Sequence, residues 1–422
     1  MSGTTSTART PTASAAQSAT TQCCIAGGGP AGMMAGYLLA RAGVNVIVLE
    51  KHADFLRDFR GDTVHPSTLE VMNELGLFDD FLKRPHSEIR EIEGQVGEES
   101  IKFADLRHLP TRAKFVAMMP QWDFLDFLAA AGRRFPEFDL RMSTEAVSLI
   151  EEGGRVAGVH ATASGQAFDI RADLVLAADG RDSRFRAAGG FAVEDLGAPI
   201  DVLWLKLPRR PDDPNLVLGR LGAGYVMVLL DRGDYFQCAF VVKKGGYDAI
   251  RDAGLDAFRQ KLAQAAPLMA DRVDALTSWD DVKLLTVSID RLPCWSKPGL
   301  LCIGDAAHAM SPVGGVGINL AIQDAVCAAN VLAGALAASH PVDPLLADVC
   351  RRRLWAVKAM QAIQVFVHRF VLAAALGSER PIKAPWPAKL FNIFPVLRRI
   401  PARVVGLGFR MEHVRTRDAH AA

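Results

Sequence analysis

Apolar runs and helical patterns alternate along the first part of the chain. The short apolar run 22–26 is expected to form a buried parallel strand, and it leads into a glycine-rich turn. Residues 33–41 then show the spacing of a helix, which closes at Gly43. A second apolar run, 44–49, predicts a second strand. Strand, turn, helix and strand in this order predict an α/β fold with a parallel sheet.

The middle of the chain has a different pattern, with short runs bounded by turn residues. The runs 200–207, 225–230 and 235–242 predict antiparallel strands, and 231–234 predicts the hairpin turn between the last two. We therefore expect a second, mostly antiparallel sheet.

Period-two alternation in this sheet leaves open which face would cover a ligand. Tyr225 shares one face with Met227 and Leu229, and Gln237 shares one face with Tyr235 and Ala239. Three residues are candidate substrate contacts, against the alternative that they are ordinary sheet core and surface: Arg220, Tyr225 and Gln237.

The glycine-rich turn after the first strand carries the first candidate chemistry. Gly27, Gly29 and Gly32 have the GxGxxG spacing, in which the glycines allow a tight turn, a close approach of backbone to a pyrophosphate, and close helix packing. The helix amino terminus offers free N–H groups and a positive dipole end to the anion. Glu50, about 20 residues on, can accept hydrogen bonds from ribose hydroxyls. This unit suits either FAD or NAD, and the alternative is a glycine-rich turn without a ligand.

Two later stretches have the same strand-to-turn form. The apolar run 173–178 leads into Asp179 and Gly180. The run 299–303 leads into Gly304 and Asp305, followed by the glycine-rich stretch 311–319. Together with the first loop, these stretches resemble the three fingerprints of the single-component FAD-dependent aromatic hydroxylases, the group that shares the p-hydroxybenzoate hydroxylase fold. The resemblance covers about 22–340.

The resemblance implies FAD as the cofactor, NADPH or NADH as a transient co-substrate, and a set of contacts to the flavin. Asp305 would bind ribityl or ribose hydroxyls, and a helix opening at 316–319 would stabilise negative charge on the pyrimidine end of the ring. Asp179 and Gly180 would serve FAD and nicotinamide together. The cofactor-binding candidates are Gly27, Gly29, Pro30, Ala31, Gly32, Glu50, Lys51, Arg60, Gly61, Gln121, Val147, Asp179, Gly180, Gly304, Asp305, Val316, Gly317, Ile318 and Asn319.

Catalytic candidates follow only from the same resemblance. Pro312 would line the reacting edge, and Arg60 would contact the cofactor near the nicotinamide path. The alternative for Arg60 is a loop ion pair with Asp58 or Asp62. His308 is expected to be a structural hydrogen-bonding residue.

The chain is therefore expected to contain two interleaved domains. A Rossmann-like FAD-binding domain would comprise 22–75, 104–190 and 286–375, and a mostly antiparallel β-sheet substrate domain would comprise 76–103 and 191–285. A disordered tail, 1–21, would precede them. A basic amphipathic carboxyl-terminal arm, helical or irregular, would follow at 376–422.

Composition narrows the function classes. The 48 Lys and Arg residues against 47 Asp and Glu residues exclude a globally basic nucleic-acid binder. Seven cysteines without a CxxC motif argue against a metal site and a disulfide framework. No window reaches about 18 uncharged apolar residues, so we expect a cytoplasmic protein. The arm holds nine basic residues between Arg380 and Arg417, and it either binds a membrane surface peripherally or packs on the substrate domain, which its prolines favour.

The leading hypothesis is an NAD(P)H- and O2-dependent monooxygenase. By the resemblance, a flavin C(4a)-hydroperoxide would hydroxylate or epoxidise an aromatic or polycyclic small molecule, with the protein excluding water. Only 4 Tyr residues are present, which favours a pocket lined by aliphatic side chains and Phe, and a bulky apolar substrate. The alternatives are a membrane-associated flavin reductase or dehydrogenase of a polyprenoid or quinone, and a non-catalytic flavin-binding redox sensor.

Overall fold

The computed structural model describes residues 18–56, 63–213 and 217–421, and a mainly parallel sheet forms its base. Parallel pairing joins β1 to both β11 and β2, and joins β2 to β8. The order is β19-β20-β11-β1-β2-β8, with β10 paired to β11 and β9 paired to β10. These strands span Ala19–Ala26 (β1), Val46–Leu49 (β2), Phe138–Arg141 (β8), Thr144–Glu152 (β9), Arg155–Ala163 (β10), Gln166–Ala177 (β11), Ser296–Lys297 (β19) and Leu300–Cys302 (β20).

The first strand begins earlier than its apolar run suggests. Ala19 and Thr20 already pair with Ile170 and Arg171 of β11. The apolar run did not include these residues, because backbone pairing with a neighbouring strand does not require an apolar side chain. The expected tail of 1–21 is therefore too long by at least three residues, and 1–17 lie outside the described part of the chain.

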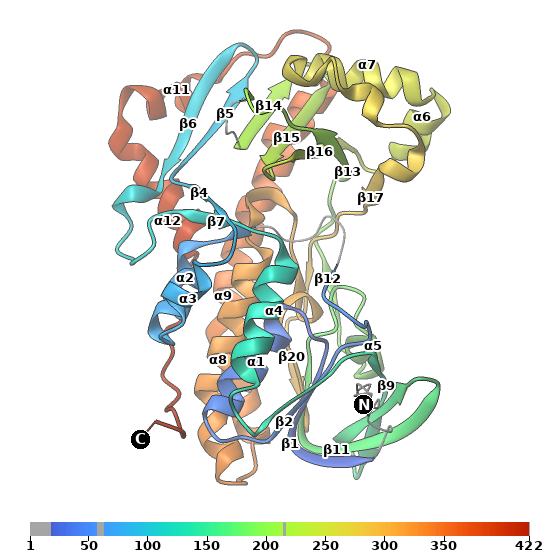
Figure 1. The fold of residues 1–422 in the computed structure, drawn as a ribbon, viewed down its shortest axis with the longest axis vertical. Coiled ribbons are helices and arrows are strands. Elements are labelled where there is room, and N and C mark those ends of the chain that lie inside the picture. Colours follow the sequence, from blue (N-terminus) through green and yellow to red (C-terminus); the bar gives the residue numbers. More distant parts are fainter. Residues whose placement is uncertain (1–17, 57–62, 214–216, 422) are drawn as a thin grey trace, which may run out of the picture.

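Long helices lie beside the parallel sheet (Figure 1). α1 packs against both α4 and α8, and α8 packs against α9, which brings three distant parts of the sequence together. The helices of this layer are α1 (Pro30–Arg41), α4 (Gln121–Gly132), α8 (Gly317–Ala337) and α9 (Asp343–Val367). The short helix α5 (Arg184–Ala188) packs instead against β9.

Two helical stretches of the described chain are long and apolar enough to cross a membrane by length and composition alone. They are Val313–Ala337 and Asp343–Gly377, and 72% and 39% of their most apolar windows are buried inside the protein. Both stretches contain charged residues, Asp324 in the first and Arg369 in the second, so they meet a looser criterion than the 18 uncharged apolar residues considered in the sequence. The first stretch is nevertheless mostly enclosed as a core helix.

The second sheet is mostly antiparallel, in the order β17-β13-β16-β15-β14-β5-β6. The predicted hairpin is confirmed, because β15 and β16 pair antiparallel across 231–235. β14 and β5 pair in parallel, which joins two distant segments. The strands span Glu91–Val96 (β5), Glu99–Asp105 (β6), Ile200–Pro208 (β13), Val217–Gly222 (β14), Tyr225–Asp231 (β15), Tyr235–Lys243 (β16) and Lys283–Leu285 (β17).

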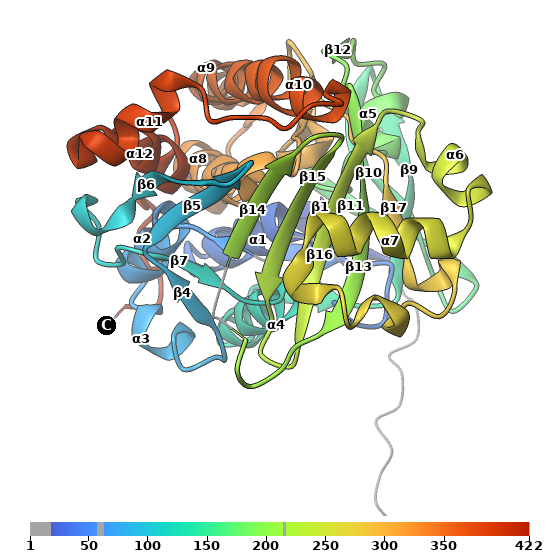
Figure 2. The same cartoon turned by 90° about the horizontal axis from the view of Figure 1, so that it is seen from above.

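One face of this sheet is covered by helices α6 (Tyr247–Asp252) and α7 (Leu255–Ala265). Met227, Leu229 and Phe240 pack there against Phe258 and Leu262 of α7. Figure 2 shows α7 lying across the strands. The opposite face is therefore the one free to close a site above the parallel sheet.

Two small sheets lie outside these layers, in the orders β3-β7-β4 and β12-β18-β21. They span Thr63–Val64 (β3), Ser87–Ile89 (β4), Val116–Met118 (β7), Glu194–Asp195 (β12), Asp290–Arg291 (β18) and His308–Ala309 (β21). The short helices α2 (Pro66–Glu74) and α3 (Phe78–Phe81) follow β3. The limits of the two domains stay a prediction.

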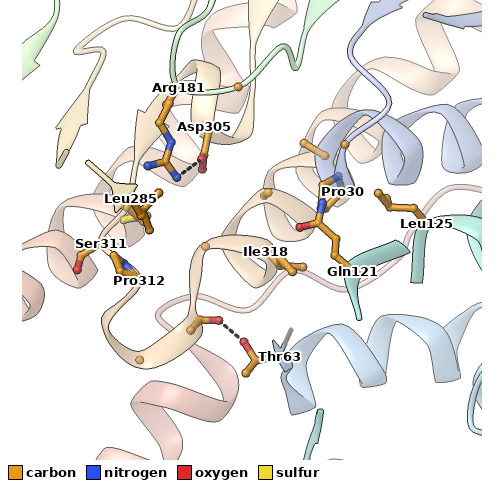
Figure 3. A pocket seen from close by; sticks show the side chains of 18 of the residues that line it. Pro30, Thr63, Gln121, Leu125, Arg181, Leu285, Asp305, Ser311, Pro312 and Ile318 are labelled. Atoms are coloured by element: carbon orange, nitrogen blue, oxygen red, sulfur yellow. Dashed lines mark hydrogen bonds and ion pairs between the residues drawn. The ribbon is translucent and has the colours of Figure 1, made fainter. Parts of the chain in front are cut away.

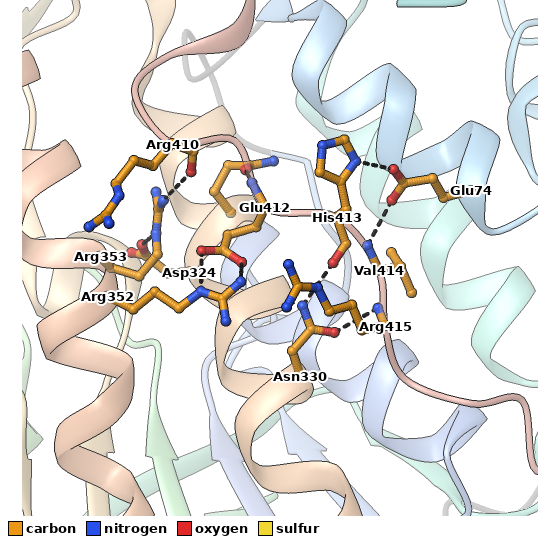
Figure 4. Close-up of polar contacts among 11 residues, drawn as sticks. Glu74, Asp324, Asn330, Arg352, Arg353, Arg410, Glu412, His413, Val414 and Arg415 are labelled. Atoms are coloured by element: carbon orange, nitrogen blue, oxygen red, sulfur yellow. Dashed lines mark hydrogen bonds and ion pairs between the residues drawn. The ribbon is translucent and has the colours of Figure 1, made fainter.

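The carboxyl-terminal arm contacts both layers of the molecule. A π-helical turn, His368–Leu372, and α10 (Ala373–Gly377) continue α9. Helices α11 (Trp386–Ile393) and α12 (Arg399–Leu407) pack against β6 of the second sheet. The expectation that the arm packs on the substrate domain is incomplete, because the segment after α12 runs along α2 and α8 (Figure 4).

Candidate active site

The first glycine loop leaves the amino terminus of α1 open. Gly27 has a φ of +109°, and a Cβ there would lie 2.3 Å from the Ala178 carbonyl oxygen. A Cβ on Gly32 would lie 2.0 Å from the Gly27 carbonyl oxygen, so strand and helix meet at van der Waals distance. Gly29 caps α1 without any side-chain hydrogen bond, and a Cβ there would meet nothing within 4 Å. The free N–H groups of this helix end suit a phosphate.

Glu50 lies at the carboxyl end of β2, directly beside this loop. Its carboxylate is only 8% exposed and accepts hydrogen bonds from the backbone N–H of Gly28 (3.1 Å) and of His52 (3.0 Å). These two bonds fix the carboxylate at the edge of the cavity, where a ribose could reach it.

The second fingerprint follows β11 and places a carboxyl group at the same edge. One oxygen of Asp179 accepts from the backbone N–H of Arg184 at 2.9 Å, while Oδ1 is buried and has no hydrogen-bond partner among the described residues. Burial raises the pKa of Asp179 above its ordinary value. A buried oxygen without a partner fits a site that a ligand donor completes.

The third fingerprint brings Asp305 to this edge as well. Asp305 lies 3.6 Å from Arg181 (Figure 3). Behind it, the Gly304 backbone N–H donates to Asp324 at 3.2 Å, and His308 Nε2 lies 2.6 Å from the same carboxylate. His308 is buried and does not line the cavity, so it holds the turn, as expected of a structural hydrogen-bonding residue.

The glycine-rich loop before α8 is tied to β3. Thr63 Oγ1 donates to the Gly315 carbonyl at 2.8 Å, and a Cβ on Gly315 would lie 2.5 Å from that hydroxyl. Asn319 accepts from the His65 backbone N–H (2.9 Å) and from Thr68 Oγ1 (2.7 Å). A Cβ on Gly317, the first residue of α8, would meet nothing within 4 Å, so a flat ring could lie against this helix end.

All of these elements open into one cavity of about 1080 Å³ between the two sheets. That volume lies at the upper end of ordinary ligand pockets, about 300–1,000 Å³, and leaves room for a dinucleotide with a second molecule. The predicted site residues that line it are Gly27, Gly29, Pro30, Ala31, Glu50, Lys51, Gln121, Asp179, Gly180, Asp305, Pro312, Gly317 and Ile318.

The remaining predicted cofactor residues lie elsewhere. Four are next to lining residues in the chain without lining the cavity themselves: Gly32, Gly304, Val316 and Asn319. Val147 is 41% exposed and lies outside the cavity. Arg60 and Gly61 lie outside the described residues.

None of the three substrate candidates lines the cavity. Arg220 pairs with Met227, and Tyr225 pairs with Gly222. Because Met227 packs against α7, its partner Arg220 lies on the face of the sheet that α7 covers. Tyr225 packs against the same cluster. Gln237 pairs with Leu230 on the cavity side, but its amide oxygen accepts a hydrogen bond from Arg232. The choice of Arg220 and Tyr225 was wrong because strand alternation gives two faces without saying which is covered.

The roof of the cavity is instead made by the alternate residues of the same strands. Its members are apolar, and none of them carries a charge: Val202, Trp204, Val226, Val228, Ala239, Val241 and Leu285. The signal was available in the strand pattern, since Val226 and Val228 alternate with Tyr225 and Met227. Among the described residues, no group of three or more His, Cys, Asp or Glu side chains could hold a metal ion.

Comparison with known proteins agrees with this geometry. A family model described as an FAD binding domain matches residues 20–362. A 6-methylpretetramide 4-monooxygenase from Streptomyces rimosus is 32% identical over 92% of this chain and 93% of its own length. A digeranylgeranylglycerophospholipid reductase from Thermoplasma acidophilum is 26% identical over 73% of this chain and 76% of its own length.

A solved structure shares the fold. An anhydrotetracycline hydroxylase from Streptomyces rimosus superposes with a TM-score of 0.70 at 20% identity, covering 92% of this chain and 76% of that chain. The family match and the 32% identical relative settle what the three fingerprints suggested. This chain belongs to the FAD-dependent aromatic hydroxylases, the single-component flavin monooxygenases that share the p-hydroxybenzoate hydroxylase fold.

Proposed function

We propose that this FAD-dependent monooxygenase uses NADPH or NADH and O2 to hydroxylate a planar polycyclic aromatic substrate. The observation that carries the proposal is one cavity with two chemically different halves. One half holds backbone N–H groups, Glu50 and Asp179, and the other is a mostly apolar roof to which β5 adds Glu91. A polar dinucleotide and an apolar polycycle match these halves. The relative that acts on 6-methylpretetramide supports the same substrate class.

The described residues fit FAD. The open amino terminus of α1 suits the pyrophosphate, the fixed carboxylate of Glu50 suits the adenosine ribose, and Asp305 suits the hydroxyls of the linking chain. When bound, FAD supplies the reduction by nicotinamide, the activation of O2 and the transfer of one oxygen atom.

The protein positions the substrate and keeps water away from it. The roof would hold an aromatic ring flat below Val226 and Val228, while Pro312 lines the opposite wall. The amino terminus of α8 directs its positive dipole end into the cavity, where it would stabilise negative charge on the ring. No lining residue of the roof needs to take part in covalent chemistry.

A reductase of a polyprenoid or quinone is the second candidate. One observation favours it, the exposed apolar residues of the carboxyl-terminal arm, which could reach a lipid surface: Trp386, Ile393, Phe394, Val396 and Ile400. The reductase relative has a shorter alignment, 326 residues against 391, and a lower identity than the monooxygenase relative.

Labelled oxygen separates the two candidates. FAD-loaded protein would be given NADPH or NADH, ¹⁸O2 and a panel of polycyclic phenols and quinones. Faster nicotinamide oxidation with ¹⁸O in an organic product supports the monooxygenase. Reduction of the compound without O2 consumption would reject it and favour the reductase.

Sedimentation with anionic vesicles, lost when 380–422 are deleted, would support membrane contact by the arm.

A further inference from the structure

Three histidines of the described chain are buried: His65, His308 and His368. His308 Nε2 contacts Asp324, and His368 Nε2 lies 2.7 Å from Ser311 Oγ. The remaining nitrogen of each, Nδ1, is enclosed by protein without a hydrogen-bond partner. His65 differs from both because it lines the cavity.

The proton of His65 is fixed on one nitrogen. Nδ1 lies 2.7 Å from the carbonyl oxygen of Val405, a residue of α12 that also lines the cavity. A carbonyl oxygen only accepts hydrogen bonds, so Nδ1 carries the proton and donates it. In the neutral ring, Nε2 then holds a lone pair and can only accept.

The accepting nitrogen belongs to a side chain that lines the cavity. Among the described residues, no hydrogen bond to Nε2 is present. His65 as a whole is 1% exposed, so a ligand would meet the ring from the cavity. A buried acceptor without a donor is costly unless a bound molecule supplies one.

Apolar residues of two neighbouring strands lie near His65 in the cavity wall. His65 is the residue that follows β3. In β3, Val64 pairs with Ala117 of β7, so the next residue of β7 in this register is Val116. Val116 in turn pairs with Ile89 of β4. Val116, Ile89 and Met118 line the same wall of the cavity. The His65 backbone N–H is held by Asn319. A donor reaching Nε2 would therefore lie beside apolar side chains, in a cavity that Thr63, Glu91 and Gln121 also line.

We propose that His65 Nε2 accepts a hydrogen bond from a hydroxyl group of the substrate and thereby selects hydroxylated polycycles and their orientation. The proposal rests on the monooxygenase function proposed above. It makes His65 a specificity-determining residue, and the carboxyl-terminal helix α12 part of the substrate site through Val405. An N–H group of the flavin ring has the same donor chemistry, so the test separates the two sources.

The test compares two ligand pairs, each measured by its dissociation constant. The first pair, 2-hydroxyanthraquinone and its methyl ether, is titrated into FAD-loaded protein. The second pair, FAD and 3-methyl-FAD, is titrated into the apoprotein. Wild-type protein should prefer the hydroxyl compound by about tenfold, because the ether leaves the acceptor unpaired. His65→Leu should reduce that ratio to about one and leave the FAD to 3-methyl-FAD ratio unchanged. His340→Leu, at an exposed position, is the control.

A measurement on the wild-type protein covers the case in which His65→Leu does not fold. In ¹⁵N-histidine-labelled protein, the resonance of one unprotonated nitrogen should shift on addition of the hydroxyl compound and stay in place with the ether. An unchanged ligand ratio, a collapse of the flavin ratio alone, or binding of neither compound would overturn the proposal. The ¹⁸O2 assay is independent of this comparison, so a failure of the monooxygenase function would be seen separately.

Discussion

Gly29 and Gly32 differ in what an added methyl group would meet. At Gly32 it would lie 2.0 Å from backbone, whereas at Gly29 it would meet open cavity. We expect Gly32→Ala to lower the free energy of unfolding by about 1–3 kcal/mol. Gly29→Ala should change it by less than about 0.5 kcal/mol and yet weaken FAD binding, because the methyl group occupies the path of the phosphate. Denaturation of the apoprotein and FAD titration measure both effects, and an equal loss of stability in both variants would contradict this geometry.

His65 should make the protein sensitive to acid. Burial lowers the pKa of His65 from 6.5 to about 4, although the hydrogen bond to Val405 opposes this. Between these values the unfolded chain binds a proton that the folded chain does not, so stability is complete above pH 6.5 and is lost as the pH falls towards 4. The loss amounts to at most about 3 kcal/mol. Urea unfolding at pH 7 and pH 4 should show a smaller drop in His65→Gln than in the wild type.

At the scale of residues, the structure brings most of the cofactor candidates, and none of the substrate candidates, to the wall of the cavity. Gly27, Glu50 and Asp179 line the cavity because a glycine turn and a strand end fix their places locally. The faces of a strand are fixed by what packs on the sheet. Tyr225 was therefore assigned to the wrong side, and the role of Val226 was missed.

At the scale of elements, β15 provides a test of which face of the second sheet meets the substrate. Val228 lines the cavity, and Tyr225 packs on the α7 side. We expect Val228→Trp to lower kcat/KM for a polycyclic substrate by at least about tenfold, because the larger ring fills the roof. FAD content should stay unchanged. Tyr225→Phe is the matched control with unchanged kinetics, and the reverse result would place the substrate on the other face.

The elements themselves were largely predictable from local pattern. β13, β15, β16 and the turn between the last two follow alternation and turn residues. The parallel pairing of β14 with β5 was not predictable, because it joins segments more than a hundred residues apart and depends on the rest of the fold. The course of the chain after α12 was missed for the same reason.

At the scale of the whole molecule, residues 410–415 form polar contacts with helices beside the parallel sheet (Figure 4). Arg352 Nε donates to the buried carboxylate of Glu412 at 2.7 Å, and Arg353, fully buried, donates to the Arg410 carbonyl at 3.2 Å. Further along, the Val414 backbone N–H donates to Glu74 at 2.7 Å. The carboxyl-terminal segment therefore connects α9, α8 and α2.

Glu412→Gln tests this connection. The amide keeps the size of the side chain but removes the charge, so Arg352 loses its ionic partner and the free energy of unfolding should fall by about 1–3 kcal/mol. Glu379→Gln is the control and should have no effect, because this exposed carboxylate forms no ion pair with another described residue. Thermal unfolding of the two variants gives the comparison. Equal melting temperatures would show that the segment contributes little to stability.

The contact between Val405 and His65 has a consequence for biosynthesis. At about 5–20 residues per second, the ribosome makes α12 tens of seconds after β3, because more than three hundred residues separate the two elements. Until then, the wall of the cavity beside His65 lacks α12, and β20 joins β1 through β11 only after some three hundred residues have been synthesised. A nascent chain therefore cannot form the complete binding site. Complete cofactor loading therefore has to wait until α12 has been made and has packed beside His65, which makes the availability of free FAD at that stage a determinant of how much newly made chain reaches its final state.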